Sequence, residues 1–427
     1  MEAERGVLKI TSQILTEKSF IYAIYLRPLS HSHKFLMKRI LPLIVIAQFF
    51  CTSVWFAGNV VMADLATTIV SDTSLLAHLT SAVQVGFISG TLIFAILAIA
   101  DRFSPSYVFF TCALFAAIFN LALCLDSLKS IEILTLRFLT GFCLAGIYPV
   151  GMKITADHFK EGLGKSLGFL VGALVLGTAF PHLVKGSFIN ISWLYVVYST
   201  SALSLCGGLL VLLFVPDGPY RKTGSQLRFT DFAKGFKNKN FRAAAFGYFG
   251  HMWELYAFWT FLPLMINQYM KQHADVELSI SLLAFSVIAV GAPACVGAGL
   301  LSQKISAKKI AFVALSVSFL CCLLSPFLLQ NNAAYNFIGF LFIWGITVIA
   351  DSPLFSSLVA KHAPNENKGS ALTIVNCIGF SITIVSIEFI NVMSKHMATH
   401  LVYSLLAIGP FLGLLALTRS RETAATQ

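Results

Sequence analysis

The sequence predicts an all-α membrane protein in which twelve transmembrane helices form two pseudo-symmetric bundles of six. Three observations lead to this prediction. First, 57% of the 427 residues are hydrophobic and 11% are charged, whereas soluble domains average about 25% charged residues. Second, apolar stretches of roughly 20 residues, long enough to cross a bilayer, follow one another from Ile40 to Leu417. Third, the first and seventh stretches begin at Ile40 and Arg242, 202 residues apart.

Short polar loops separate the predicted spans. The spans are residues 40–62, 80–100, 107–125, 131–154, 165–184, 192–215, 242–267, 279–301, 309–329, 335–359, 369–392 and 399–418. They divide the chain into a cytoplasmic N-terminal tail (1–39), an N-terminal bundle (40–215), a basic linker (216–241), a C-terminal bundle (242–418) and a C-terminal tail (419–427). The first tail has two interpretations, a helix on the membrane surface or an extension before a native start at Met37.

The positive charges indicate how the chain is oriented. With the N-terminus in the cytoplasm, 25 of the 30 Lys and Arg residues fall on the inner side and 4 in outer loops, while Arg137 lies within a span. An excess of basic residues in inner loops is typical of membrane proteins. We therefore expect a multi-pass protein of the inner (cytoplasmic) cell membrane with both termini in the cytoplasm. The net charge of +11 reflects this topology, and we expect no nucleic-acid partner.

Other function classes lack their signals. The loops are too short for a catalytic domain, so we expect no enzyme. Gly164-Lys165-Ser166 is similar to the end of a phosphate-binding loop, but Phe159 stands where that loop needs its first glycine. The histidines lack metal-ligand spacing, and the nine cysteines all lie in predicted spans. We expect no cofactor and no metal, and a monomer whose partners are lipid, a small solute and protons.

Two loops carry related turns at the 202-residue offset. Asp101-Arg102 follows the second span, and Gln303-Lys304 follows the eighth. Both turns resemble the Gly-x-Leu-Ala-Asp-Arg-x-Gly-Arg-Arg loop of the major facilitator superfamily of secondary transporters, and the resemblance extends over about 40–418. It implies two six-helix halves around a central cavity. It also implies that Asp101, Arg102 and Lys304 close the cytoplasmic side, whereas the plainer interpretation is a turn that only carries positive-inside charge.

The fourth span also resembles that family, because RFLTGFCLAG begins with an arginine inside the membrane, followed by small residues. The spacing Gly141-x-x-x-Ala145 predicts a close-packing helix face. Arg137 has three interpretations: an anion-binding site, the counter-ion of Glu254, or an ion pair that only fixes helix packing.

Ionisable groups inside spans are costly, so each is a functional candidate. His251 and Glu254 lie near the middle of the seventh span, and their spacing of three places them on one helical face where they can hydrogen-bond. Together they could take up and release a proton; the alternative is a self-satisfied structural pair. Asp351, in the tenth span, either joins this pathway or caps a helix broken before Pro353. Further polar and aromatic span residues are candidates to line the cavity, although such residues often only pack: Trp55, Asn59, Gln84, Trp253, Tyr256 and Asn376.

The sequence thus predicts a secondary transporter that moves a small organic solute by alternating access and is coupled to protons through Glu254. A second hypothesis is a uniporter or importer of an organic anion, including a siderophore-like chelate, held by Arg137. A third, from another class, is a membrane sensor or receptor built on a transporter scaffold.

Overall fold

The computed structural model describes residues 39–62, 64, 75–159, 163–187, 192–221, 235–363 and 368–419. Most of the predicted N-terminal tail, the middle of the linker and the end of the C-terminal tail lie outside these residues. The chain divides into two compact units, Met1–Leu43 and Ile44–Gln427. The contacts below are those of the second unit.

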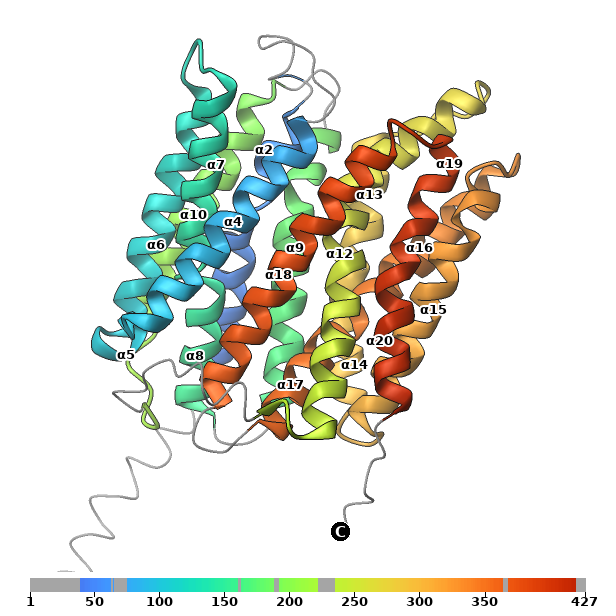
Figure 1. Cartoon of the computed structure of the whole chain (residues 1–427). Helices are drawn as coiled ribbons and strands as arrows, with labels where there is room; N and C mark the ends of the chain where they lie inside the picture. Colours follow the sequence, from blue (N-terminus) through green and yellow to red (C-terminus); the bar gives the residue numbers. More distant parts are fainter. Residues whose placement is uncertain are drawn as a thin grey trace, which may run out of the picture. The chain divides into compact units, whose positions relative to one another are not determined.

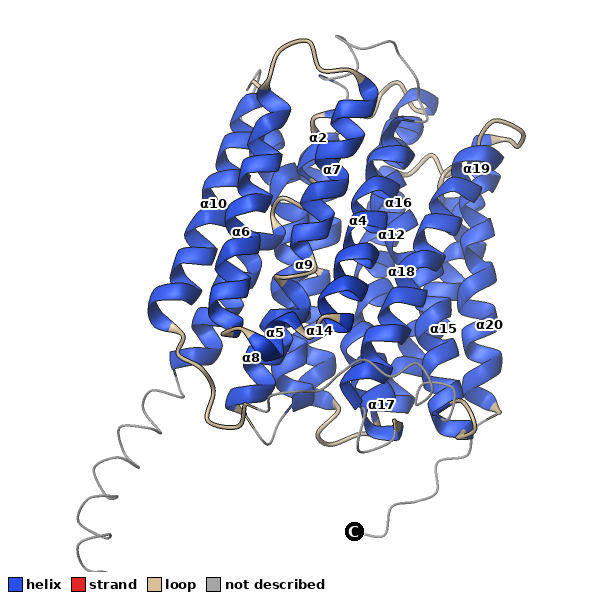
Figure 2. Cartoon of the chain, turned by 60° about the vertical axis from the view of Figure 1, so that its left-hand side comes forward, coloured by secondary structure: helices blue, strands red, loops and turns tan. Residues whose placement is uncertain are grey.

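The part of the chain that the structure describes is built of helices and connecting turns (Figure 2). The longer helices in the first part of the sequence are α4 (Leu75–Ile96), α6 (Pro105–Leu121), α7 (Ser130–Leu144), α8 (Tyr148–His158), α9 (Leu163–Ser187) and α10 (Leu194–Phe214). Those in the second part are α12 (Lys239–Gln272), α13 (Ile280–Ala289), α14 (Gly291–Leu301), α15 (Ala307–Leu328), α16 (Ala334–Ala350), α17 (Ser352–His362), α18 (Lys368–Met393) and α20 (Ile408–Thr418). Short helices are α2 (Ala57–Val60), α5 (Ile99–Arg102) and α19 (Thr399–Val402), together with 3-10 turns at Ala122–Cys124 and Tyr403–Ala407.

Ten segments of the described chain are long and apolar enough to cross a membrane. This finding supports the predicted all-helical membrane fold. The first predicted span, 40–62, differs from a single helix: the helix Arg39–Thr52 stops, and α2 begins only at Ala57. The seventh, 242–267, is longer than predicted, because Asn238 caps α12 by accepting from the backbone N–H groups of Asn240 and Phe241.

Two helices are interrupted at corresponding places. The helix α7 ends at Leu144, and α8 resumes at Tyr148. Likewise α16 ends at Ala350 and α17 resumes at Ser352, 204 residues after Tyr148. Each second segment carries a proline in its first turn, where the missing N–H costs little. Turn hydrogen bonds continue across both interruptions, for example from the N–H of Ile147 to the carbonyl of Leu144 and from the N–H of Leu354 to the carbonyl of Asp351.

Glycines bring certain helix pairs into backbone contact. A Cβ on Gly141 of α7 would lie 2.0 Å from the carbonyl oxygen of Val83 on α4, and one on Gly86 would lie 2.0 Å from that of Phe138. The predicted close-packing face at Gly141 is therefore confirmed. The contact between α9 and α14 is looser, because a Cβ on Gly168 would lie 3.0 Å from the carbonyl oxygen of Cys295.

Helices from distant parts of the sequence also lie side by side. The helix α4 packs against α18, and α9 packs against α13 and α14. Figure 1 shows α6, α7 and α10 on one side of α4, and α15, α16 and α20 on the far side of α12 and α18. Through these contacts, α4 and α9 of the first part of the sequence meet α13, α14 and α18 of the second.

Candidate functional site

The carboxyl group of Glu254 is buried on α12, with a side chain 1% exposed. One of its oxygens, Oε1, accepts hydrogen bonds from the Ser318 hydroxyl, from the Cys322 thiol at 3.2 Å and from the indole Nε1 of Trp344. These donors come from α15 and α16, and all are neutral. No cation pairs with Glu254 among the described residues, so its charge depends on whether a proton is bound.

The spacing of His251 and Glu254 predicted a hydrogen-bonded pair, but the structure does not contain it. The Nδ1 atom of His251 lies 2.8 Å from Oδ1 of Asp351, and both side chains are almost fully buried. Neither atom makes a hydrogen bond of good geometry, so the contact is a close approach of two titratable groups. The prediction was wrong because the interruption between α16 and α17 brings Asp351 toward α12.

Asp351 itself lies at that interruption, between the end of α16 and the start of α17. Its side chain makes no capping hydrogen bond, although its backbone carbonyl accepts from the N–H groups of Leu354 and Phe355. The prediction that Asp351 caps the broken helix is therefore wrong for the side chain. The carboxyl group instead contacts His251 and joins two elements through a titratable pair.

Arg137 occupies a separate site on α7 and is fully buried. Its guanidinium donates to the carbonyl oxygens of Val54, at 3.0 Å, and Trp55, and to Oδ1 of Asn120 at 3.3 Å. The two carbonyls are free of helical bonds because the first span is interrupted at this point. Arg137 is thus not the counter-ion of Glu254, and no carboxylate pairs with it among the described residues. Gly58 leaves the room it needs, because a Cβ there would lie 2.8 Å from Nε.

Six aromatic rings pack together, contributed by the turn before α2 and by α4, α12 and α18. Two of them, Trp55 and Tyr256, are candidates from the sequence to line a central cavity. Each ring is 3% exposed or less. Trp55 stacks on Tyr256 and on Phe380 at centroid distances of 5.8 and 5.9 Å. We call this set the ring cluster; its members are Trp55, Phe56, Phe87, Tyr256, Trp259 and Phe380.

The other predicted cavity residues divide into two groups. Gln84 is fully buried on α4, one turn from Phe87, and Asn59 donates to the hydroxyl of Thr80, also on α4. Both therefore lie beside the ring cluster, and Asn376 is half-buried on α18, one turn before Phe380. Trp253 was wrongly predicted, because its indole packs on Phe389 and donates to the carbonyl of Leu405, away from this set.

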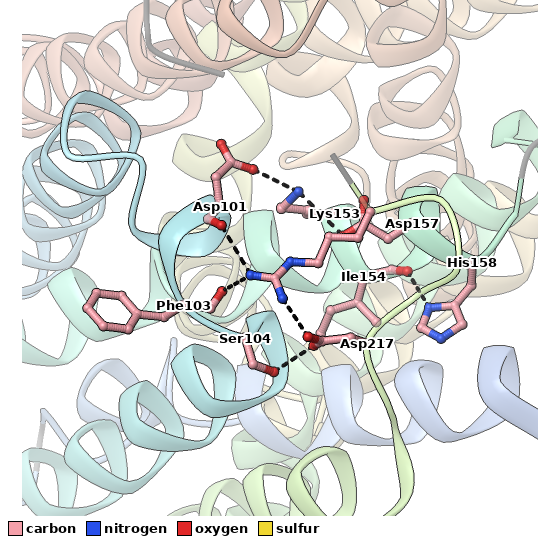
Figure 3. A network of polar contacts seen from close by, with 9 residues as sticks. Asp101, Phe103, Ser104, Lys153, Ile154, Asp157, His158 and Asp217 are labelled. Atoms are coloured by element: carbon pink, nitrogen blue, oxygen red, sulfur yellow. Dashed lines mark hydrogen bonds and ion pairs between the residues drawn. The ribbon is translucent and has the colours of Figure 1, made fainter. Parts of the chain in front are cut away.

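A polar network forms where α5 meets α8 and the start of the linker (Figure 3). Oδ1 of Asp101 lies 2.9 Å from Nζ of Lys153, which also lies 3.4 Å from Asp157. Arg221 donates to the backbone carbonyls of Asp101 and Phe103. These contacts hold the turn and the first linker residues in one arrangement.

Asp217 completes this network. One of its carboxylate oxygens accepts from the Ser104 hydroxyl at 2.6 Å, and the other pairs with Arg221. Arg102 and Lys304 are exposed. Of the three predicted gate residues, Asp101 is therefore the one that the structure places in a network of ion pairs.

Comparison with known proteins gives the family. The model of the Major Facilitator Superfamily matches residues 44–387, more than half of the chain. The chain belongs to this superfamily. It is a multi-pass membrane protein of a transporter family, as the sequence predicted. A search of curated proteins found no match.

For this superfamily member, sequence reasoning missed one acid that had a clear signal. Glu388 lies within the predicted span 369–392, so it is a functional candidate on the same ground as Glu254. It accepts from the Ser81 hydroxyl at 2.7 Å, and its Oε2 lies 3.7 Å from Nε2 of His78. Glu388 thus links α18 to α4 at the end of α4 near Leu75. The neutral partners of Glu254 and Arg137, by contrast, are ordinary residues that no motif distinguishes.

Proposed function

We propose that this protein is a proton-coupled secondary transporter that moves a small organic solute by alternating access. The observation that carries the proposal is the environment of Glu254, a deeply buried carboxyl held by three neutral donors and by no cation of the part of the chain that the structure describes. Such a group gains or loses a proton when its access to water changes. It is therefore suited to bind a proton on one side of the membrane and release it on the other.

Two six-helix halves, 40–215 and 242–418, would supply that change of access. The recurrence of the elements supports this division: α7 and α16 begin 204 residues apart, and so do α8 and α17. Inverted or parallel repeats with interrupted helices are common in secondary transporters, and their sites lie where the halves meet. Here α4 and α9 of the first part of the sequence meet α13, α14 and α18 of the second.

The pair formed by His251 and Asp351 would transmit protonation to the backbone. Asp351 stands at the interruption between α16 and α17, and His251 lies on α12 one turn before Glu254. A proton on His251 strengthens its attraction to the carboxylate, whereas a proton on Asp351 removes it. The position of the interrupted helix would thereby depend on the same gradient that Glu254 senses.

On the proposed topology, the network around Asp101 lies at the cytoplasmic surface. Its ion pairs are partly exposed, and exposed pairs contribute little free energy and break readily. That property suits a contact that forms and breaks during a transport cycle. The basic residues of the loops support the same orientation, with both termini in the cytoplasm of a cell whose inner membrane holds the protein.

Import of an organic anion through Arg137 has less support. Both terminal nitrogens of its guanidinium already donate to backbone carbonyls or to Asn120. An anion would have to displace these bonds and leave the two carbonyls at the interruption without donors. We therefore assign Arg137 to the support of the interrupted first span.

The test uses purified protein in liposomes that contain a pH-sensitive dye. Solutes are added under an imposed pH gradient, and proton movement is followed with wild type, Glu254→Gln and Glu277→Gln. Glu277 is an exposed acid, so its variant is the matched control and should behave as wild type. Glu254→Gln should abolish solute-dependent proton movement while its melting curve shows folded protein.

If Glu254→Gln moves protons with solute as wild type does, proton coupling through Glu254 is wrong. A sensor would instead bind a solute without any flux in these liposomes, and that result would overturn transport as a whole.

A further inference from the structure

The ring cluster is surrounded by polar atoms that have nothing to bind. The indole Nε1 atoms of Trp55 and Trp259 have no hydrogen-bond partner among the described residues, and neither do the two amide atoms of Gln84 or Oδ1 of Asn59. Trp55, Trp259 and Gln84 are 1% exposed or less. A buried polar group without a partner costs about 1–3 kcal/mol. Several in one place therefore indicate a site that a ligand completes.

The residues of this site come from both parts of the sequence. Gln84 and Phe87 lie one turn apart on α4, and Phe87 packs on Phe380 of α18 at a centroid distance of 4.5 Å. Trp55 contacts Phe87 and stacks on Tyr256 of α12. A ligand among these rings would thus touch both proposed halves at once.

The chemistry of the set selects the ligand. The ring faces favour a flat, unsaturated molecule, because aromatic groups pair through their faces and edges. Two free indole N–H groups require acceptor atoms, and the free amide of Gln84 both donates and accepts. No Asp, Glu, Lys, Arg or His belongs to the set.

The surrounding charges disfavour an ionic ligand. Ring faces alone can attract a cation, but no carboxylate is free to add to that attraction here, because Glu254 accepts from Ser318, Cys322 and Trp344. Arg137 also donates to the backbone carbonyl of Trp55 and so brings a positive charge close to the cluster. An anion would need a free cation, but both terminal nitrogens of Arg137 donate to Asn120 or to backbone carbonyls, and only its buried Nε lacks a partner among the described residues.

We propose that the ring cluster is the binding site for a planar, uncharged aromatic or heteroaromatic solute that carries carbonyl or ring-nitrogen acceptors. The proposal rests on the proposed transport function for its physiological meaning, but the binding can be measured without flux. The rings pack on one another in this structure, so the solute must separate them to enter. It then accepts from the indole N–H groups of Trp55 and Trp259 and exchanges hydrogen bonds with Gln84.

Calorimetric titration of the detergent-purified full chain tests the ligand class. The neutral planar probes are nicotinamide and uracil; benzoate is the anionic probe and phenyltrimethylammonium the cationic one. We expect saturable binding of at least one neutral probe and weaker or no binding of both ions. Tighter binding of either ion than of the neutral probes overturns the proposal. Failure of both neutral probes to bind also overturns it, and indicates that water alone satisfies the free atoms.

Variants then locate the site. Trp55→Phe keeps a stacking ring but removes one N–H, and should weaken the neutral probe about fivefold, the value of one hydrogen bond. Trp253→Phe is the matched control, because its N–H already donates to Leu405 outside the cluster, and it should bind as wild type. Equal affinity of Trp55→Phe and wild type contradicts the assignment.

Gln84→Met gives a readout that a purely structural glutamine would not produce. Replacing an unpaired buried amide by an apolar side chain of similar size should raise the melting temperature of the free protein while binding of the neutral probe becomes weaker. A lower melting temperature with unchanged binding contradicts the proposal. The Glu254→Gln variant separates the two proposals. Unaltered proton-coupled flux in this variant contradicts coupling through Glu254, whereas saturable binding of the neutral probe by the same variant still supports the binding site.

Discussion

Arg137 and Glu254 are buried charged residues in the two parts of the chain, and their hydrogen-bond partners differ. Arg137 is bound by backbone carbonyls of the first span and by Asn120 of α6. Glu254 is bound by side chains of α15 and α16, among them Cys322, which follows Asn120 by 202 residues. The repeat thus holds a cation in its first copy and an acid in its second.

Only one of these two charges can change within the physiological pH range. A guanidinium stays protonated at any physiological pH, so Arg137 is a permanent charge that replaces the lost helical donors of Val54 and Trp55. A carboxyl among neutral donors can exist with or without its proton. We therefore expect the Arg137 site to control folding and the Glu254 site to control the response to pH. Four predictions test this contrast, in order of decreasing effect.

Arg137→Ala should have the largest effect. It leaves two buried carbonyls at the interruption without donors, and each lost charge-assisted hydrogen bond costs about 1.5–3 kcal/mol. We expect poor yield of monodisperse protein and a much lower melting temperature, measured by thermal unfolding in detergent. Arg137→Lys, which keeps the charge but not the two-pronged geometry, should be intermediate. A wild-type melting curve for Arg137→Ala would refute the structural role.

Glu254→Gln should change stability in a way that depends on pH. The amide never carries the charge that the wild-type carboxylate acquires when the pH rises, and an unpaired buried charge is destabilising. In acid, the variant and the wild type should therefore have equal melting temperatures. As the pH rises, the variant should become more stable relative to the wild type. Melting curves across the pH range check this, with Glu277→Gln as the exposed control. A constant difference at all pH values would disagree with it.

Trp344→Phe should alter transport more than folding. In the wild type, the ring of Trp344 stacks on Phe258 at a centroid distance of 4.5 Å. A phenylalanine keeps a ring for this contact, but it loses the N–H that donates to Glu254. Because that donor stabilises the ionised form, its loss should move the pH midpoint of transport upward by roughly 0.7 unit, the equivalent of about 1 kcal/mol. The check is flux against pH, and an unmoved midpoint would show that the indole only packs.

The smallest effects should come from the matched positions Asn120 and Cys322. Asn120→Ala removes an acceptor from Arg137 and should lower the melting temperature by the equivalent of about 1 kcal/mol, without changing the pH profile. Cys322→Ala should change the pH profile of transport and leave the melting temperature nearly unchanged. The reason is that the thiol is a weak donor, which contributes little to stability, but it donates to Glu254. Thermal unfolding and flux against pH are measured for both variants. If Asn120→Ala changes the pH profile and Cys322→Ala lowers the melting temperature, the contrast between the two sites is wrong.

The sequence allowed the helical membrane fold and the family to be predicted because apolar length and a repeated turn are local signals. It also marked Glu254, Arg137 and Asp351 correctly as buried charges. Their partners could not be predicted, because spacing along one helix says nothing about neighbouring helices. His251 was paired with Glu254 on its own helix, whereas the interruption at Asp351 supplied the actual contact.

The ring cluster was also beyond prediction in detail. Trp55 and Tyr256 were expected at a cavity, but Phe87 and Phe380 are indistinguishable in sequence from the many other phenylalanines of the chain. Only the approach of α4 to α18 brings these two rings together. The network of Ser104, Asp217 and Arg221 likewise depends on the path of the chain after α10.

The glycine contacts have a mechanical consequence. A methyl group at Gly86 or Gly141 would collide with backbone at 2.0 Å, so α4 and α7 must keep their present register. At Gly168 the corresponding distance is 3.0 Å, and at Gly172 it is 3.1 Å. A shift of a few tenths of an ångström would admit a side chain there. An alanine at Gly168 or Gly172 should therefore disturb the packing less than an alanine at Gly86 or Gly141.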